Sequence, residues 1–229
     1  MLRLAHAGHR PSILSFLVAA AVAIPGAAAA DKAADAGDEK GFVALFNGKD
    51  LDGWQGATKG YEVADGVLVC QKQGGGNLYT AKEYKDFVFR FEFKLEPGAN
   101  NGVGLRTPMK GDAAYVGMES QILDNDHEMY KNIAPYQAHG SIYGVIPAKR
   151  GALKKTGEWN SQEITLKGRD VKVVLNGTTI VEGNLDKAST PKTMDGHDHP
   201  GLKNEKGYIG FLGHGARIEF RNLRVKELE

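Results

Sequence analysis

The chain has 229 residues, a formal net charge of +1 and a single cysteine. Because no basic patch or block of like charges runs through it, the charge pattern argues against nucleic acid as a partner. The lone Cys70 excludes an internal disulfide. It lies in a strand-like run, residues 67–70, and we interpret it as a small buried hydrophobic residue in preference to a reactive exported thiol.

The N-terminus is typical of an export signal. Arg3 and Arg10 precede a short apolar run over residues 13–24, and an alanine-rich end follows Pro25. This order predicts a secretory signal peptide over residues 1–30. The alternative is a membrane anchor, but a spanning helix needs about 20 apolar residues, and this run is shorter. We therefore expect an exported protein, periplasmic or extracellular, with no stable membrane span after cleavage.

The rest of the chain is expected to form one domain. Residues 31–40 are polar and rich in Ala, Asp and Lys, which predicts a disordered leader. The remaining residues, 41–229, number about 190, which is the usual length of a single domain with a substantial core.

Short alternating segments dominate this domain. Between Tyr84 and Leu95, four phenylalanines and Leu95 alternate with mostly polar residues, which is typical of a half-buried strand. Asn176-Gly177 predicts a tight hairpin turn. Further strands are predicted over residues 67–70, 103–107, 118–123, 140–145, 160–167, 171–175, 178–182, 207–212 and 216–225. Many short strands with regular turns predict an all-β sandwich or jelly roll.

Strand alternation also selects candidate site residues. Glu119 and Gln121 share one face of their strand, about 6.5–7 Å apart. In the preceding strand Gly102, Gly104 and Arg106 share a face, and glycines beside an arginine leave room for a ligand to approach the backbone. We interpret this face as a binding surface. The alternative is the ordinary solvated face of an antiparallel sheet.

Two histidines extend this candidate site. His139, Ser141 and Tyr143 align in the segment that follows. If the three strands face the same way, they place a carboxylate, a cation, a histidine and a phenol on one sheet face. His214 lies between two glycines, where it either projects over the sheet rim or belongs to a turn. We favour the first interpretation.

A metal site is weakly indicated. Asp195-Gly-His-Asp-His199 resembles a metal-binding cluster, but its ligands are crowded beside Pro200-Gly201. It lies in a stretch over residues 186–206 that has no strand pattern, and we expect a mobile surface loop there. A requirement for a divalent cation stays open at this point, and so does the oligomeric state.

Six ordered motifs resemble the 3-keto-disaccharide hydrolase domain family, long labelled a domain of unknown function. They lie at residues 41–54, 100–106, 117–125, 140–144, 157–160 and 213–222, and include Asn100-Asn-Gly-Val-Gly-Leu-Arg106, Gly117-Met-Glu-Ser-Gln-Ile-Leu-Asp-Asn125 and Gly213-His-Gly215. Asn101 departs from the family, which often has serine there. The resemblance covers nearly all of residues 41–228. It implies a single-domain concanavalin A-like jelly-roll β-sandwich acting on a small carbohydrate, a 3-oxo sugar or 3-oxo-glycoside.

The implied chemistry assigns roles as hypotheses. A 3-oxo group acidifies the hydrogen at C2, so a single base takes that proton, the group at C1 leaves by elimination, and water adds back. We predict Glu119 or His139 as the base, Arg106 or a bound cation as the stabiliser of the enolate oxygen, and His214 as the proton donor. The expected substrate contacts are Asn101, Gln121, Asp124, Tyr143 and Trp159. An alternative for Trp159 is a core anchor in a turn.

Two other classes of function stay open. A conventional glycoside hydrolase would place two carboxylates roughly 5–9.5 Å apart around the bond, but this strand offers Glu119 followed by Gln121. A non-catalytic carbohydrate-binding module would need exposed aromatic platforms, and aromatic residues make only 8% of the chain. Both are therefore less favoured than action on an oxidised sugar.

Overall fold

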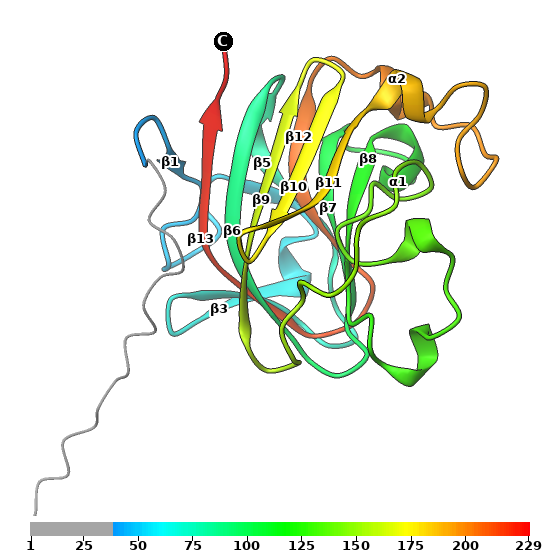
Figure 1. The fold of residues 1–229 in the computed structure, drawn as a ribbon. Coiled ribbons are helices and arrows are strands. Elements are labelled where there is room, and N and C mark those ends of the chain that lie inside the picture. Colours follow the sequence, from blue (N-terminus) through cyan, green and yellow to red (C-terminus); the bar gives the residue numbers. More distant parts are fainter. Residues whose placement is uncertain (1–38) are drawn as a thin grey trace, which may run out of the picture. The chain divides into compact units, whose positions relative to one another are not determined.

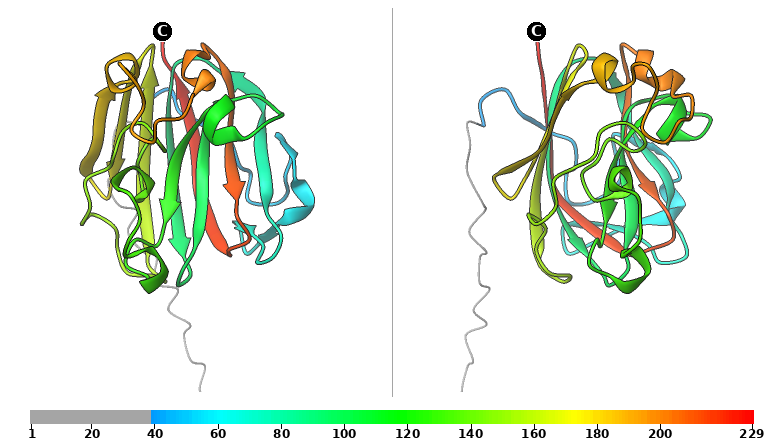
Figure 2. Two further views of the ribbon diagram at one scale, coloured as in Figure 1. Left: turned by 90° about the vertical axis from the view of Figure 1, so that its right-hand side faces the viewer. Right: turned by 45° about the vertical axis from the view of Figure 1, so that its right-hand side comes forward.

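The computed structural model describes residues 39–229. The predicted signal peptide (1–30) and most of the predicted leader (31–40) lie outside the described residues, so export stays a prediction. Within residues 39–229, two antiparallel sheets pack face to face (Figures 1 and 2). No helix in this part of the chain is long and apolar enough to cross a membrane.

The larger sheet has the strand order β11-β10-β9-β6-β13-β4-β3, with β1 paired to β13. Its strands are β1 (Val43–Ala44), β3 (Tyr61–Ala64), β4 (Val67–Cys70), β6 (Phe87–Leu95), β9 (Trp159–Lys167), β10 (Asp170–Leu175), β11 (Thr178–Asn184) and β13 (Ile218–Glu227). The smaller sheet has the order β2-β5-β12-β7-β8. Its strands are β2 (Trp54–Gly56), β5 (Gly76–Tyr84), β7 (Asn100–Thr107), β8 (Met118–Leu123) and β12 (Gly207–Gly213).

Short helices occur only in the connections between these strands of the described chain. They are α1 (Ala113–Val116), α2 (Leu185–Ala188) and the 3-10 turns η1 (Thr58–Gly60), η2 (Glu128–Tyr130), η3 (Pro135–Gln137) and η4 (Pro200–Lys203). α1 and the loop with η2 and η3 lie beside the smaller sheet (Figure 2). They therefore stand where they can wall a cleft on its outer face.

The core lies between the two sheets, and the alternation in β6 is its clearest sequence signature. The four phenylalanines of β6 are each at most 1% exposed, as the period-2 pattern predicts. Phe211 of β12 crosses from the opposite sheet and stacks on Phe220 of β13, with ring centroids 3.9 Å apart. Cys70 is fully buried, which confirms its interpretation as a packing residue, and burial raises the pKa of its thiol.

The predicted hairpin forms between β10 and β11. Asn176 and Gly177 both have positive φ angles, 49° and 81°, as a two-residue type I′ turn requires. The strand predicted over residues 140–145 differs, because only isolated bridges form there. The segment still lies along β8, since Gln121 N donates to Ser141 O (2.9 Å) and Tyr143 N donates to Glu119 O (2.9 Å).

The stretch over residues 186–206 has more defined structure and more buried side chains than a plain surface loop. It ends in η4, and Thr193 and His199 within it are buried. The side chains of Asp195 and His199 are 4% and 1% exposed. Burial of polar side chains at these positions gives no periodic signal, which is why the sequence pattern predicted a mobile surface loop.

Candidate active site

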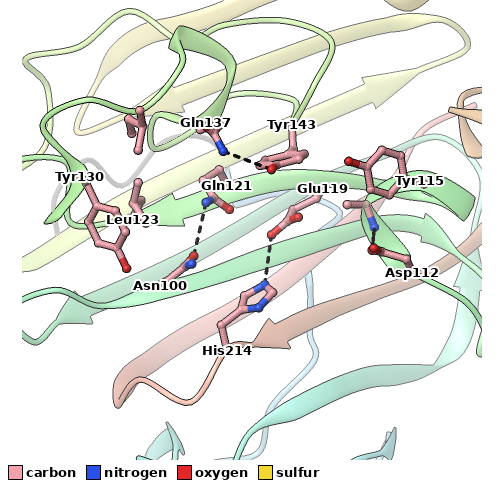
Figure 3. Close-up of a pocket in the computed structure, with 12 residues that line it drawn as sticks. Asn100, Asp112, Tyr115, Glu119, Gln121, Leu123, Tyr130, Gln137, Tyr143 and His214 are labelled. Carbon is pink, nitrogen blue, oxygen red and sulfur yellow. Dashed lines mark hydrogen bonds and ion pairs between the residues drawn. The ribbon is translucent and has the colours of Figure 1, made fainter. Parts of the chain in front are cut away.

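A cleft of about 300 Å³ lies on the outer face of the smaller sheet, above β7 and β8 (Figure 3). This volume is at the lower end of the range of about 300–1,000 Å³ typical of small-molecule sites. The lining residues are Asn100, Asp112, Ala114, Tyr115, Glu119, Gln121, Leu123, Tyr130, Ile133, Gln137, Tyr143 and His214. Three of the twelve come from alternate positions of β8, so the floor follows directly from strand geometry.

Glu119 occupies the centre of the floor. Its residue is 5% exposed, and burial raises the pKa of its carboxyl group, because desolvation penalises the charged form. Gly102 on β7, the register partner of Gln121, makes room for the Glu119 side chain: a Cβ at Gly102 would lie 1.9 Å from Glu119 Oε1. The glycine-rich strand therefore accommodates the carboxylate of the neighbouring strand, whereas the sequence suggested room for a ligand.

His214 faces Glu119 from the connection between β12 and β13. Its Nε2 lies 3.8 Å from Glu119 Oε1, and its side chain is half exposed. Glu119 raises the pKa of His214, because the carboxylate favours the imidazolium, and partial burial opposes this effect. A buried carboxylate and a histidinium thus form an acid–base pair with one partner open to solvent.

Gln121 adjoins this pair on the floor and supports Glu119. Its amide nitrogen donates to Glu119 Oε1 (3.0 Å) and to Asn101 O (3.1 Å). These hydrogen bonds favour the carboxylate form of Glu119 and fix the amide within the floor.

The phenol rings of Tyr115 and Tyr143 lie over the floor, opposite His214 (Figure 3). Gln137 Nε2 donates to the Tyr143 hydroxyl oxygen at 3.3 Å, which leaves the Tyr143 O–H to donate into the cleft. Burial raises the pKa of Tyr115, and the electrostatic effect of Tyr143 raises it further. Tyr115 therefore remains a neutral hydrogen-bond donor at physiological pH.

The two ends of the cleft differ in polarity. Leu123 and Tyr130 lie together at one end (Figure 3), and Ile133 is a further apolar residue of the lining. At the other end Asp112 contributes the second carboxylate of the lining, but it caps α1 by accepting from Ala114 N at 3.1 Å. Glu119 is thus the buried carboxyl group of the lining, whereas Asp112 is exposed.

Arg106 does not enter this cleft. Tyr208 pairs with Thr107 and Gly210 pairs with Gly104, so β7 carries one residue more than β12 between these pairs. This β-bulge shifts the alternation of faces, and Arg106 adopts a left-handed φ of 48°. The shared face predicted from strict alternation therefore ends before Arg106.

The guanidinium of Arg106 instead donates four hydrogen bonds to the structure around it. Its Nε donates to Lys85 O (2.6 Å), one terminal nitrogen to Gly168 O (3.0 Å) and Asn204 O (3.2 Å), and the other to Asp86 Oδ1 (2.7 Å). The side chain is 2% exposed. These contacts join three loops at one end of the sandwich, so Arg106 holds the fold together away from Glu119.

His139 also lies outside the cleft. Its Nδ1 accepts from Leu123 N (3.2 Å), so the proton sits on Nε2, which donates to Gln162 Oε1 at 2.9 Å. The ring stacks on Phe93 with centroids 5.0 Å apart. Burial lowers the pKa of His139 to about 4. A histidine whose two nitrogens are both occupied inside the core is not placed to take a substrate proton.

The predicted contact at Asn101 falls one position from the residue that lines the cleft. Asn101 faces the core, where its Oδ1 accepts from Gly102 N at 2.8 Å and its Nδ2 lies 3.7 Å from Cys70 Sγ. Asn100 lines the cleft instead. The alternation that selected Gly102 and Gly104 also selects Asn100, so this residue was within reach of sequence reasoning.

Asp124 and Trp159 are likewise placed elsewhere. Asp124 accepts from Gly98 N at 2.9 Å and closes the turn before β7. Trp159 begins β9 of the larger sheet, where Arg221 lies 4.0 Å from its ring centroid. Of the predicted residues, the structure gathers four in the cleft: Glu119, Gln121, Tyr143 and His214.

The lining residues that sequence reasoning missed come mainly from loops. They are Asp112, Ala114, Tyr115, Tyr130, Ile133 and Gln137, together with Asn100 and Leu123 on the strands. No group of three or more His, Cys, Asp or Glu side chains that could hold a metal ion gathers in the part of the chain that the structure describes. Asp195 and His199, the strongest candidates in the sequence, pair with each other at 3.0 Å.

The fold and the cleft define a concanavalin A-like jelly-roll protein with a carboxylate–histidine pair on one sheet. Residues 41–226 match the model of the 3-keto-alpha-glucoside-1,2-lyase-like domain, and the chain belongs to this family. The resemblance that the six sequence motifs indicated is thereby confirmed, and with it membership of a family of glycosidic-bond-cleaving enzymes.

Similar proteins support the same assignment. The chain is 26% identical to a 3-keto-disaccharide hydrolase of Bacteroides thetaiotaomicron, over 84% of this chain and 80% of that protein. A solved structure from Parabacteroides distasonis, provisionally assigned as a glycosyl hydrolase, is 32% identical with a TM-score of 0.73, covering 82% of this chain and 99% of that one. A Bacillus subtilis protein of galectin-like fold shares the fold alone, at 13% identity and a TM-score of 0.51, covering 81% of this chain and 94% of that one.

Proposed function

We propose that this protein cleaves the glycosidic bond of 3-oxo-glycosides, beginning with removal of the proton at C2. The observation that carries the proposal is the buried carboxyl group of Glu119 beside His214. A conventional hydrolase places two carboxylates roughly 5–9.5 Å apart around the bond, whereas the second acid of this lining, Asp112, is exposed and caps α1. The names of the family and of the Bacteroides relative point to the same substrate class.

The first step is a proton transfer from carbon. The ketone at C3 acidifies the C2 hydrogen, and the Glu119 carboxylate takes this proton while the electrons of the C–H bond form an enolate across C2 and C3. A carboxyl group whose pKa is raised by burial is a stronger base than an ordinary glutamate, which suits this task. The Tyr143 and Tyr115 hydroxyls face Glu119 across the cleft and supply hydrogen bonds for the enolate oxygen at C3.

The second step breaks the glycosidic bond. The enolate electrons re-form the C3 carbonyl and make a C1–C2 double bond, and the C1–O bond breaks with its electrons going to the leaving oxygen. The His214 imidazolium donates a proton to that oxygen. Water then adds across the C1–C2 double bond, with its hydroxyl going to C1 and its remaining proton to C2, which gives the free 3-oxo sugar. Release before water adds would make the same site a lyase.

The pair resets itself without a change in total charge. After bond cleavage Glu119 is protonated and His214 is neutral. A proton passed from Glu119 to His214 restores the starting state, and it travels through one bridging water, because the 3.8 Å between them exceeds direct hydrogen-bond reach.

Matched incubations with a nitrophenyl glucoside and its 3-oxo form test the proposal. We expect cleavage of the 3-oxo form alone, and in D₂O the product carries deuterium at C2. Glu119→Gln and His214→Gln each lower the rate roughly 10²- to 10⁴-fold, the usual contribution of general acid–base catalysis. Glu62→Gln, an exposed change on β3, leaves it unchanged.

Each contrary outcome identifies another function. Cleavage of the unoxidised glucoside at a comparable rate would make the protein a conventional glycoside hydrolase. Tight binding of ordinary glycans with no turnover of either glucoside would make it a binding module. Full activity of Glu119→Gln would refute the assignment of the base.

A further inference from the structure

The loop over residues 193–199 packs directly behind the aromatic side of the cleft. Within it, His199 Nε2 and Asp195 Oδ2 form a pair at 3.0 Å, and both side chains are almost fully buried. The second oxygen of Asp195 accepts from Thr193 Oγ1 and from His197 N, each at 3.0 Å. The carboxylate is thus held on both oxygens, which fixes its position within the loop.

The pair closes against the backbone beside Tyr143. A Cβ at Gly144 would lie 2.4 Å from Asp195 Oδ2 and 2.7 Å from His199 Nε2, so the paired atoms sit directly on this glycine. Asp195 N also donates to Gly144 O at 3.2 Å. Gly144 has a φ of 74°, a conformation that favours glycine and turns the chain just after Tyr143.

The same histidine supports the second phenol. The ring of His199 lies against the ring of Tyr115, with centroids 4.7 Å apart. Tyr115 belongs to α1, a helix of only four residues, and its hydroxyl reaches the cleft from there. A helix this short has little stability of its own, so contact with a fixed ring restrains where its tyrosine lies.

We propose that Asp195 and His199 form a positioning pair that holds Tyr115 and Tyr143 at the enolate oxygen. The inference rests on the proposed function, in which both hydroxyls act on the reacting sugar. Neither member of the pair lines the cleft. Both act through the residues they touch: His199 through the ring of Tyr115, and Asp195 through the turn at Gly144 that aims Tyr143.

A double-mutant cycle separates positioning from plain stability. His199→Gln keeps a group able to hydrogen-bond Asp195 but removes the ring that supports Tyr115. We expect it to lower kcat on the 3-oxo-glucoside about 10- to 100-fold with little change in KM, because misplaced groups lose interactions made in the transition state. In a Tyr115→Phe background the same change lowers kcat by less than about threefold, since the hydroxyl it positions is absent.

A second set of variants tests the contact between Asp195 and the turn at Gly144. Asp195→Ala lowers kcat, and Asp195→Asn, which keeps the shape and one polar contact, restores most of the loss. Asp198→Ala, at the exposed neighbouring acid, is the matched control and keeps wild-type kcat. Thermal unfolding of each variant confirms that it is folded at the assay temperature.

The outcomes distinguish the two proposals. Equal losses from His199→Gln in the wild-type and Tyr115→Phe backgrounds, or a rise in KM alone, would overturn the positioning role. If the wild type turns over no 3-oxo-glycoside, the proposed function fails by itself. In that case the positioning role of Asp195 and His199 is tested by the NMR chemical shifts of the Tyr115 ring, whose resonances are assigned by their absence in Tyr115→Phe. Shifts that stay unchanged in His199→Gln would overturn the inference, and displaced shifts support it.

Discussion

Replacing Gly102 by alanine tests the role of Glu119 without changing Glu119 itself. The added Cβ would lie 1.9 Å from Oε1, 2.6 Å from Cδ and 2.7 Å from Cγ of Glu119. Gly102 does not have a positive φ, so its backbone conformation is open to alanine. The whole perturbation therefore falls on the carboxylate of the proposed base.

The magnitude follows from the contact distance. Real Cβ atoms essentially never come within 3.0 Å of another heavy atom, so the carboxylate must move by about 1 Å, and a misplacement of that size costs roughly 10²-fold in rate. A factor of 10² corresponds to about 2.7 kcal/mol of transition-state stabilisation. The cost in stability is smaller, because the group that moves is the end of a flexible side chain.

Steady-state kinetics on a 3-oxo-glucoside, with thermal unfolding alongside, measure both effects. The matched control is Gly104→Ala, two residues along the same face, whose Cβ would meet Thr107 Cγ2 at 3.1 Å and Leu212 Cδ2 at 3.3 Å as its nearest atoms. We expect kcat/KM near the wild-type value for this control. The reasoning is refuted if Gly102→Ala keeps more than half of kcat/KM, or if both variants lose it equally.

Two further predictions concern pH. A profile of kcat/KM against pH should be bell-shaped, because Glu119 acts as a carboxylate and His214 as an imidazolium. The midpoints of both limbs lie above the ordinary pKa values of Glu and His, since both pKa values are raised. The variant His214→Gln should lack the alkaline limb. Burial lowers the pKa of His139 to about 4 in the folded protein. Between about pH 6.5 and 4, therefore, only the unfolded chain binds a proton at this residue. As the pH falls through this range, the contribution of His139 to the free energy of unfolding decreases by roughly 3 kcal/mol. Urea unfolding at pH 4.5 and 7 should show the wild type losing more stability than His139→Asn; equal losses would contradict the assigned burial.

The local features of the sandwich were predictable from the sequence. The β6 phenylalanines alternate because successive side chains of a strand point to opposite faces, and the Asn176-Gly177 turn follows from two positive φ angles. The same rule placed Glu119 and Gln121 side by side on one face. These results depend only on covalent geometry within a few residues.

Tertiary structure decided which polar groups meet. A bulge in β7 turned Arg106 away from the floor, and packing against Phe93 drew His139 into the core. The pairing of Glu119 with His214, and the arrival of Tyr115 from a four-residue helix, depend on how distant segments are brought together. The alternation of a strand repeats along the chain and can therefore be recognised in the sequence. The paths of loops and the positions of bulges depend on packing across the whole domain. The sequence alone therefore determined the sandwich, the family and half of the floor, and the folded chain determined the acid–base pair and its phenols.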